Sequence, residues 1–207
     1  MIMQLLANTT SPYVRIARVA MIEKGLNIEP TIVDPWADDA RLREANPATR
    51  VPTLITDEGI PLTESLLIVQ WLEHTRPAPS WPSLLGPSQG AAGVLSRAGI
   101  ALGVIDAAVH TIIIRKVTAP VPFDETPVGL RRRRTMAEGM ARLESIAARG
   151  ELTASDAPRL DAICAVVALD YLRLRFADQP WMPRMPALDA LSQSLRQRTS
   201  FAQTLPC

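Results

Sequence analysis

The sequence is short of cysteine, of aromatic residues and of net charge, and each shortage excludes a class of protein. Its two cysteines, Cys164 and Cys207, lie far apart and form neither a Cys-x-x-Cys pair nor a metal-ligand spacing. A disulfide scaffold, a zinc site and a dithiol redox centre are therefore not expected, and we predict no bound metal. The formal net charge of +1 provides no long-range field for nucleic acid or an anionic membrane.

Long apolar segments are also missing. No run approaches the roughly 20 apolar residues that a membrane helix requires. The first eight residues lack the basic segment and apolar core of a signal peptide. With 207 residues, 47% of them hydrophobic, the chain can bury the core of one large or two small domains. We expect a globular cytosolic protein with no membrane or nucleic-acid partner.

The first 80 residues alternate between the period of a strand and the period of a helix. The pattern predicts the order βαβαββα, with strands at residues 3–7, 28–33, 51–56 and 60–63 and helices at residues 12–25, 38–45 and 65–75. Gly25 is expected to end the first helix, and Gly59 to form the turn of a hairpin. Leu67 and Trp71 form an apolar stripe that we expect in the core.

A proline-rich segment at residues 77–87 cannot continue a helix and is expected to link two domains. Beyond it the pattern is helical, with helices predicted at residues 89–116, 127–148, 158–176 and 186–196. The predicted fold class is an α/β domain, residues 1–80, followed by an all-α domain, residues 87–207. Cys164 lies in an apolar helical run and is expected to be a buried structural thiol.

Two short segments of the first domain have the features of a peptide-binding edge. Pro52 opens a strand-like run, and a cis bond between Val51 and Pro52 would turn the Val51 N–H and C=O outward towards an extended ligand. Glu64 and Ser65 lie where a strand gives way to a helix, and free N–H groups at a helix start favour a carboxylate. Together they predict a small peptide ligand.

The start of the first helix allows two interpretations. Ser11 followed by Pro12 is a strong helix start, and Ser11 could serve only as its cap. Alternatively, its hydroxyl and the positive end of the helix could stabilise a ligand thiolate, moving a thiol pKa of about 8.5 towards neutrality. The protein would then activate a cysteine that belongs to its ligand.

These pieces together resemble the amino-terminal domain of glutathione S-transferases, and most closely the serine-type bacterial and plant tau-like groups. The similarity lies in the order and spacing of five motifs across residues 1–80, at residues 11–15, 23–25, 46–47, 50–54 and 62–65. The helical remainder, which ends in Thr199, Ser200 and Phe201, resembles the carboxyl-terminal domain of the same family. The resemblance implies a thioredoxin-like domain that binds glutathione and a helical domain that shapes an electrophile pocket.

The resemblance also implies roles for individual residues at the thiol and cysteinyl part of glutathione. Ser11 would hydrogen-bond the thiolate, with Thr10 as the fallback hydroxyl. Val51 would pair its backbone with the cysteinyl residue beside cis Pro52.

At the two ends of the tripeptide the resemblance implies charged contacts. Glu64 would bind the γ-glutamyl ammonium and Ser65 its carboxylate, while Arg50 occupies the place of a basic residue near the glycyl carboxylate. A second basic residue is expected near the start of the second helix, yet this chain has Asp38 and Asp39 there, with Arg41 and Arg43 further on.

The implied partners are glutathione as co-substrate, a small electrophile and a second copy of the chain in a homodimer. Tyr13, Asp106 and His110 are the candidates for the electrophile pocket, with Arg115 one turn beyond His110. The resemblance also implies a Ser/Thr-x-x-Asp capping box at the start of the core helix of the second domain. This chain departs from that box, and Asp156 would cap the helix with Pro158 in its first turn.

Two other functions of the same fold are weighed against thiolate activation. Thiol transfer and disulfide reduction need a protein thiolate, and Ser11 stands where those activities need cysteine, so conjugation or isomerisation through activated glutathione is favoured. A non-catalytic protein of the same fold, acting as a binding or regulatory partner, is the second hypothesis.

Overall fold

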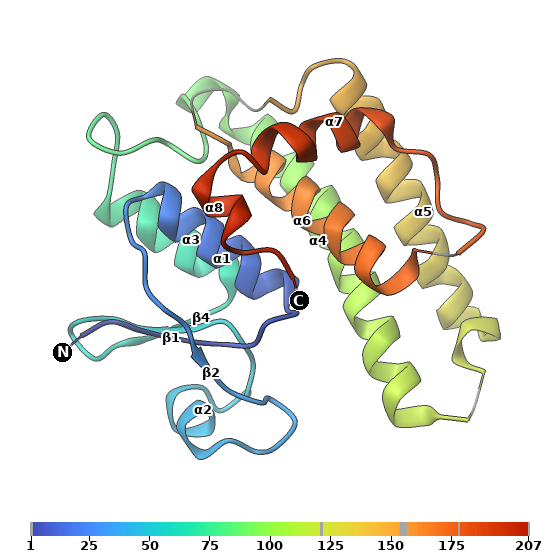
Figure 1. Cartoon of the computed structure of the whole chain (residues 1–207), viewed down its shortest axis with the longest axis horizontal. Helices are drawn as coiled ribbons and strands as arrows, with labels where there is room; N and C mark the ends of the chain where they lie inside the picture. The colour runs from blue at the N-terminus through green and yellow to red at the C-terminus, as the bar shows by residue number, and fades with distance from the viewer. Residues whose placement is uncertain (1, 121, 154–156, 178, 207) are drawn as a thin grey trace. The chain divides into compact units, whose positions relative to one another are not determined.

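The chain divides into two units, and the first, residues 1–84 with 198–207, contains a four-stranded sheet with helices on both faces. The computed structural model describes residues 2–120, 122–153, 157–177 and 179–206. The sheet has the order β2-β1-β3-β4. The elements of this unit are β1 (Gln4–Ala7), α1 (Pro12–Glu23), β2 (Thr31–Ile32), α2 (Ala40–Ala45), β3 (Thr53–Ile55), β4 (Pro61–Thr63), α3 (Ser65–Thr75) and α8 (Thr199–Ala202). Helices α1 and α3 cover one face, and α2 covers the other (Figure 1).

The predicted order βαβαββα is confirmed, and the local stop signals act as expected. Gly25 has φ +73° directly after α1, where a side chain would also collide with the ring of Trp81. Gly59 has φ +82° in the turn between β3 and β4. The strands are shorter than predicted, and β2 in particular keeps two of the six residues expected.

One prediction about the core is wrong. The buried residues of α3 are Ser65, Ile68, Val69 and Leu72, whereas Leu67 is 53% exposed. These four residues are spaced three and four apart and form one stripe of the helix. Leu67 and Trp71 belong to a neighbouring stripe, which periodicity alone does not distinguish from the buried one.

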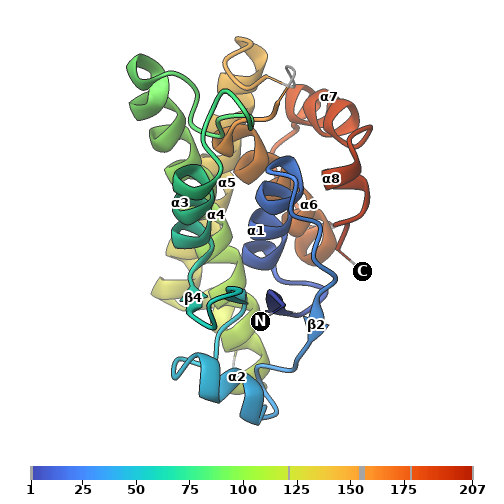
Figure 2. The same ribbon diagram turned by 90° about the vertical axis from the view of Figure 1, so that its left-hand side faces the viewer.

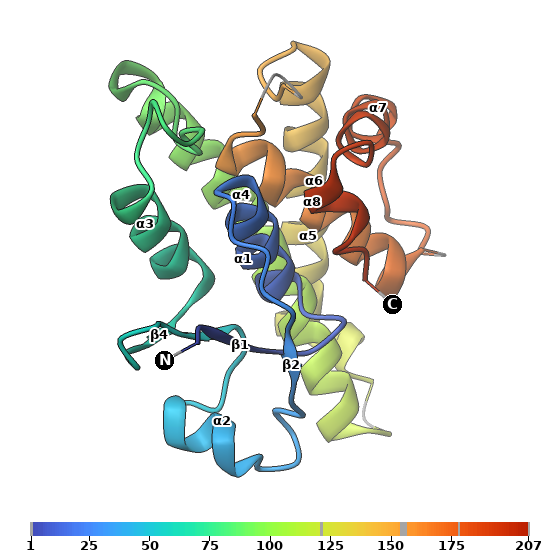
Figure 3. The same ribbon diagram turned by 60° about the vertical axis from the view of Figure 1, so that its left-hand side comes forward.

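The second unit is a bundle of helices. It contains α4 (Ser88–Thr118), the 3₁₀ turn η1 (Phe123–Glu125), α5 (Pro127–Ala148), α6 (Leu160–Phe176) and α7 (Pro186–Leu195). Helix α4 packs against α5 and α6, and α7 packs against α5 and α6 (Figure 3). Cys164, on α6, is fully buried, and burial raises the pKa of its thiol far above the usual range. This thiol is a core side chain, as predicted.

The start of α6 departs from its predicted detail. The helix begins at Leu160, and the carboxylate of Asp161 accepts a hydrogen bond from Arg97 Nε at 2.7 Å. Asp156, predicted as the cap, lies outside the described residues. Asp161 is buried, so the ion pair with Arg97 of α4 compensates its desolvation.

The sequence was expected to lack a segment apolar enough to span a membrane, and helix α4 departs from that expectation. By length and composition it could cross a membrane, because its most apolar window has a mean hydropathy of 1.6. Core helices of soluble proteins pass the same criterion, and α4 packs against both α5 and α6.

The carboxyl-terminal residues belong to the first unit. The chain divides into Met1–Leu84 with Arg198–Cys207, and Leu85–Gln197. Glu23 of α1 accepts two hydrogen bonds from Arg198, at 2.9 and 2.7 Å, and Phe201 is fully buried. The helical unit thus ends ten residues earlier than the predicted range 87–207, because a bidentate ion pair returns the last segment to α1.

A buried lysine ties the end of α1 to the end of α3. Lys24 is fully buried, and its Nζ lies 2.6 Å from Glu73 Oε1 and donates to the Arg76 carbonyl at 2.8 Å. Glu73 also accepts hydrogen bonds from the Leu84 N–H and the Ser83 hydroxyl. One carboxylate therefore fixes α1, α3 and the segment that follows α3.

We predict that Glu73→Gln lowers the free energy of unfolding by about 3 kcal/mol, because a buried ammonium loses its counter-ion. Urea unfolding followed by circular dichroism measures the change. The matched control is Glu58→Gln in the exposed β3–β4 turn, expected to stay within about 0.5 kcal/mol of the parent chain. A Glu73→Gln protein as stable as that control would contradict the assignment.

Candidate functional site

Strand register brings four loop segments to one edge of the sheet. Strands β1 and β2 are parallel, with Ala7 opposite Ile32. Strand β3 is antiparallel to β1, and β4 is antiparallel to β3, so Thr53 lies beside both Leu6 and Thr63. The carboxyl ends of β1, β2 and β4 therefore meet the amino end of β3. We call this the Ser11 edge; it comprises residues 8–11, 33–39, 50–52 and 64–65.

The Ser11 edge gathers every residue predicted to bind glutathione. From the loop after β1 come Thr10 and Ser11, from the segment before β3 come Arg50, Val51 and Pro52, and from the junction of β4 and α3 come Glu64 and Ser65. Figure 2 shows β4 and β2 on opposite sides of the sheet, so the segments follow one another along the edge in strand order.

Ser11 is the N-cap of α1. Its Oγ accepts a hydrogen bond from the Val14 N–H at 3.3 Å, and its own N–H donates to Asn8 Oδ1 at 2.9 Å. Capping uses one lone pair of the hydroxyl, and the O–H proton is not needed for it. The two interpretations of Ser11 are therefore compatible, since the same side chain can cap the helix and donate to an anion.

The segment before β3 is held by a buried asparagine. Asn46 Nδ2 donates to the Arg50 carbonyl at 3.0 Å and to Thr53 Oγ1 at 3.2 Å, and Thr53 Oγ1 donates to the same carbonyl at 2.9 Å. The Val51–Pro52 bond is cis, as predicted. Pairing begins at Thr53, so the Val51 N–H and C=O lie outside the strand ladder.

Asn46 is a positioning residue, and the sequence pattern gave it no role in the site. Its side chain is 5% exposed and also accepts the Ala48 N–H at 3.0 Å. The available signal was the Asn-Pro pair at residues 46–47, which favours a turn. The hydrogen bonds that make Asn46 important depend on the fold around it.

Glu64 and Arg50 form an ion pair at the Ser11 edge. Arg50 Nη2 lies 2.7 Å from Glu64 Oε1, with side-chain exposures of 69% and 51%. Glu64 has φ +65° and ψ +126°, a conformation that residues with a Cβ rarely adopt. Ser65 is 4% exposed and begins α3, whose first turn has no side-chain cap among the described residues. Backbone strain and uncapped N–H groups thus coincide here.

The candidates for the electrophile pocket are divided between the two units. Tyr13 is on α1 in the first unit, and Asp106 and His110 lie on α4 in the second, where both are exposed. Arg115 lies one turn beyond His110, and its Nε donates a hydrogen bond to Asp124 Oδ1 at 2.9 Å. It ties α4 to η1.

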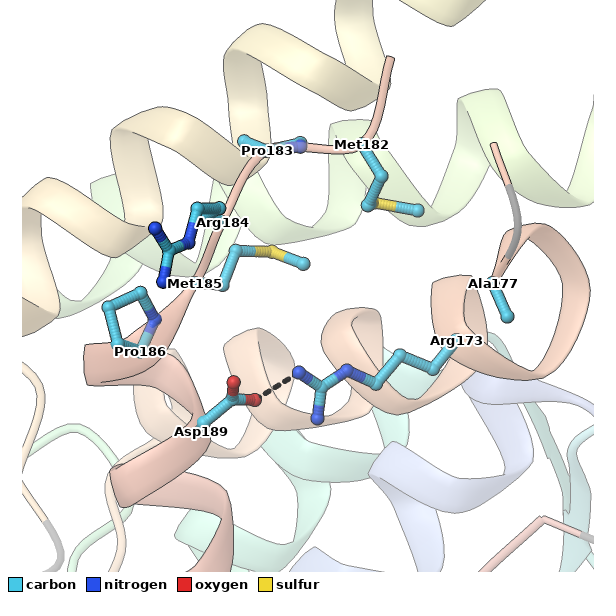
Figure 4. A pocket seen from close by; sticks show the side chains of 8 residues that line it. All are labelled: Arg173, Ala177, Met182, Pro183, Arg184, Met185, Pro186 and Asp189. Carbon is cyan, nitrogen blue, oxygen red and sulfur yellow. Dashed lines mark ion pairs between the residues drawn. The ribbon is translucent and has the colours of Figure 1, made fainter. Parts of the chain in front are cut away.

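Two pockets lined by described residues lie away from the Ser11 edge. One, of about 550 Å³, lies in the second unit, where Arg173 pairs with Asp189 beside Met182 and Met185 (Figure 4). The other, of about 580 Å³, lies between α2 and the sheet and is lined by residues such as Leu6, Arg41 and Ile55. Neither contains a predicted glutathione or electrophile contact. Within the described ranges no group of three or more His, Cys, Asp or Glu side chains could hold a metal.

Known proteins resemble the chain over both units. The family model "Glutathione S-transferase, N-terminal domain" matches residues 5–80. The uncharacterised GST-like protein YibF of Escherichia coli K12 is 29% identical over 204 residues, 99% of this chain and 98% of YibF. A glutathione S-transferase of Methylobacterium radiotolerans, solved with glutathione sulfonate, is 31% identical with a TM-score of 0.85, covering 99% of this chain and 94% of its own.

A second solved structure gives the same fold. The glutathione S-transferase of Methylobacillus flagellatus, with glutathione bound, is 26% identical and has a TM-score of 0.86 over the full length of both chains. The predicted fold class, a thioredoxin-like domain followed by a helical domain, is confirmed by these similarities and by the structure.

We predict that strain at Glu64 reverses the usual order of alanine and glycine. At an ordinary exposed position glycine is less stable than alanine by about 0.5–1 kcal/mol. Relief of the positive φ should instead make Glu64→Gly more stable than Glu64→Ala by about 1 kcal/mol. Paired urea unfolding curves test this, and an alanine variant equal to or better than the glycine variant would exclude strain.

Proposed function

Because the chain belongs to the glutathione S-transferase family, we propose that it binds glutathione at the Ser11 edge and uses the bound thiolate to attack a small electrophile. The observation that carries this proposal is the convergence of residues 10–11, 50–52 and 64–65 on one edge. Two solved relatives with glutathione or glutathione sulfonate bound support it.

In the proposed complex each part of the tripeptide meets one segment. The cysteinyl backbone pairs with the N–H and C=O of Val51, beside Pro52, in continuation of the sheet edge. The γ-glutamyl carboxylate accepts hydrogen bonds from Ser65 and the uncapped start of α3. The γ-glutamyl ammonium binds Glu64, which Arg50 holds in place through their 2.7 Å ion pair.

The role proposed for Ser11 is to stabilise the thiolate. Its O–H donates to the sulfur while its lone pair keeps capping α1, and the positive end of the helix favours the negative charge. The glutathione thiol loses its proton to solvent, and the thiolate forms a C–S bond with the electrophilic carbon. In a substitution the leaving group, a halide for an aryl halide, departs with the electron pair of the broken bond, and in an addition the π electrons of the double bond take up a proton from solvent. The gain in rate comes from a larger thiolate population and from proximity.

This mechanism is the serine-type mode of the family. Serine cannot form the mixed disulfide that thiol transfer requires, so the proposal is conjugation or isomerisation. Thr10 is the second hydroxyl at the same edge and the fallback donor. Tyr13, Asp106 and His110 are kept as proposed contacts of a small electrophile, and we further propose a cytosolic detoxification role.

We predict that Ser11→Ala raises the pKa of the bound glutathione thiol by about one unit or more and lowers conjugation of an aryl halide about tenfold at pH 7. Thiolate absorbance against pH measures the first, and product absorbance the second. Loss of the cap alone would lower stability by about 1 kcal/mol without changing the thiol pKa.

Ser11→Asp separates capping from donation. Aspartate caps helices as well as serine does, but its carboxylate only accepts hydrogen bonds. The variant should keep the stability of the parent chain and lose thiolate stabilisation. Unchanged thiol pKa in both variants would remove Ser11 from the mechanism, and the same measurement on Thr10→Ala would then examine the fallback hydroxyl.

Calorimetry with glutathione distinguishes the transferase from a non-catalytic binding or regulatory protein of the same fold. No heat at millimolar glutathione would overturn the proposal. Binding without a lowered thiol pKa would favour the non-catalytic alternative.

We also propose a homodimer, supported by the exposed apolar face of α3. Leu66 and Leu67 are 40% and 53% exposed on neighbouring positions of this helix. Leu67→Glu should therefore shift the protein from dimer to monomer in analytical ultracentrifugation. The control is Gln203→Glu, which adds a negative charge at an exposed polar position outside α3. A monomeric parent chain would contradict the proposal.

A further inference from the structure

Strand order determines which segment the third residue of the tripeptide meets. This step depends on the function proposed above. With the γ-glutamyl end at Glu64 and Ser65, beside β4, and the cysteinyl part at Val51, beside β3, an extended ligand continues towards β1 and β2. The segment that leaves β2 at this edge is residues 33–39, and it begins where the Val33 N–H donates to the Ala7 carbonyl at 2.9 Å.

This segment and the helix that follows it carry an excess of acid. Residues 33–44 contain four carboxylates and two guanidinium groups. The acids nearest the sheet are Asp34, whose carboxylate accepts the Trp36 N–H at 2.8 Å, and then Asp38 and Asp39. A terminal carboxylate arriving here meets like charge, which is unfavourable at short range.

The arginines near this edge are already engaged with carboxylates. Arg41 Nη2 lies 3.2 Å from Asp39 Oδ2, and Arg43 pairs with Asp38. The Arg41 contact also lowers the pKa of the Asp39 carboxyl, which keeps it charged. Arg50 is paired with Glu64, on the γ-glutamyl side of the site. A glycyl carboxylate at Arg50 would have to share the guanidinium with Glu64, whose negative charge it would meet at short range.

The same segment presents an apolar surface. Trp36 is 52% exposed, between Asp34 and Asp38 in the loop. An indole surface favours an uncharged, partly apolar group over a hydrated carboxylate. The excess of negative charge and the apolar surface at this end therefore both favour an uncharged terminal group on the ligand.

We infer that this site accepts γ-glutamyl-cysteinyl thiols whose carboxyl-terminal group is uncharged, as an ester or amide, with an affinity similar to or higher than that for glutathione itself. Recognition rests on the γ-glutamyl and cysteinyl parts, and the third residue is tolerated without its charge. Asp38 is the acid to test, since its side chain is 68% exposed, lies outside the helices and strands, and engages Arg43 in an ion pair.

Isothermal calorimetry at pH 7 and low salt, with glutathione and its glycyl monoethyl ester as probes, tests the inference. The expected result is a Kd for the ester that is lower than, or within about threefold of, the Kd for glutathione. An ester that binds more than threefold weaker overturns this inference and leaves the glutathione proposal standing. Failure of both ligands to bind overturns the glutathione proposal, and the inference with it.

Asp38→Asn identifies the residue responsible. Asp38 has φ +52°, a conformation that asparagine tolerates, so the loop should keep its shape. The variant is expected to bind glutathione about two- to threefold more tightly and the ester unchanged, because the change removes one exposed negative charge and releases Arg43 from its ion pair. Glu58→Gln, in the β3–β4 turn, is the matched control and should alter neither affinity. An equal change for both ligands would overturn the role of Asp38.

Discussion

The antiparallel insertion of β3 beside β1 is the constraint on which the candidate site depends. Because Thr53 lies opposite Leu6 and also opposite Thr63, the start of β3 meets the ends of β1 and β4 at one edge. A shift of register by one residue would exchange the two faces of the strand and move Val51 away from Ser11. The buried side chain of Asn46 fixes the same segment from beneath through the Arg50 carbonyl.

The role proposed for Ser11 would combine a structural and a chemical function in one side chain. The helix needs an oxygen that accepts from Val14 N–H, and a thiolate needs a proton donor at the same place. A hydroxyl offers both at once, whereas carboxylates, which cap equally well, offer only acceptors. Serine is therefore suited to a helix start that also faces an anion.

Charge is distributed unevenly along the Ser11 edge, and this gives the two ends of the site different chemistry. Beside α3, uncapped N–H groups and Ser65 favour a carboxylate, and Glu64 favours an ammonium group. Beside β2, carboxylates outnumber guanidinium groups, and the arginines are paired with acids. The ion pair between Arg50 and Glu64 connects the two regions. A ligand with a charged head and an uncharged tail suits this arrangement.

The sequence by itself determined the order of the elements, the cap at Ser11, the stops at Gly25 and Gly59, the buried thiol of Cys164 and the set of residues that meet at the Ser11 edge. The first four features follow from local rules of period, capping and backbone conformation, which act over a few residues, whereas the full set of residues at the Ser11 edge was implied by the resemblance to glutathione S-transferases. Only the tertiary structure decided that Leu67 is exposed, that Arg198 returns the last residues to Glu23, and that Arg50 pairs with Glu64. Those outcomes depend on contacts between residues distant in the chain, where several partners of equal local propensity compete.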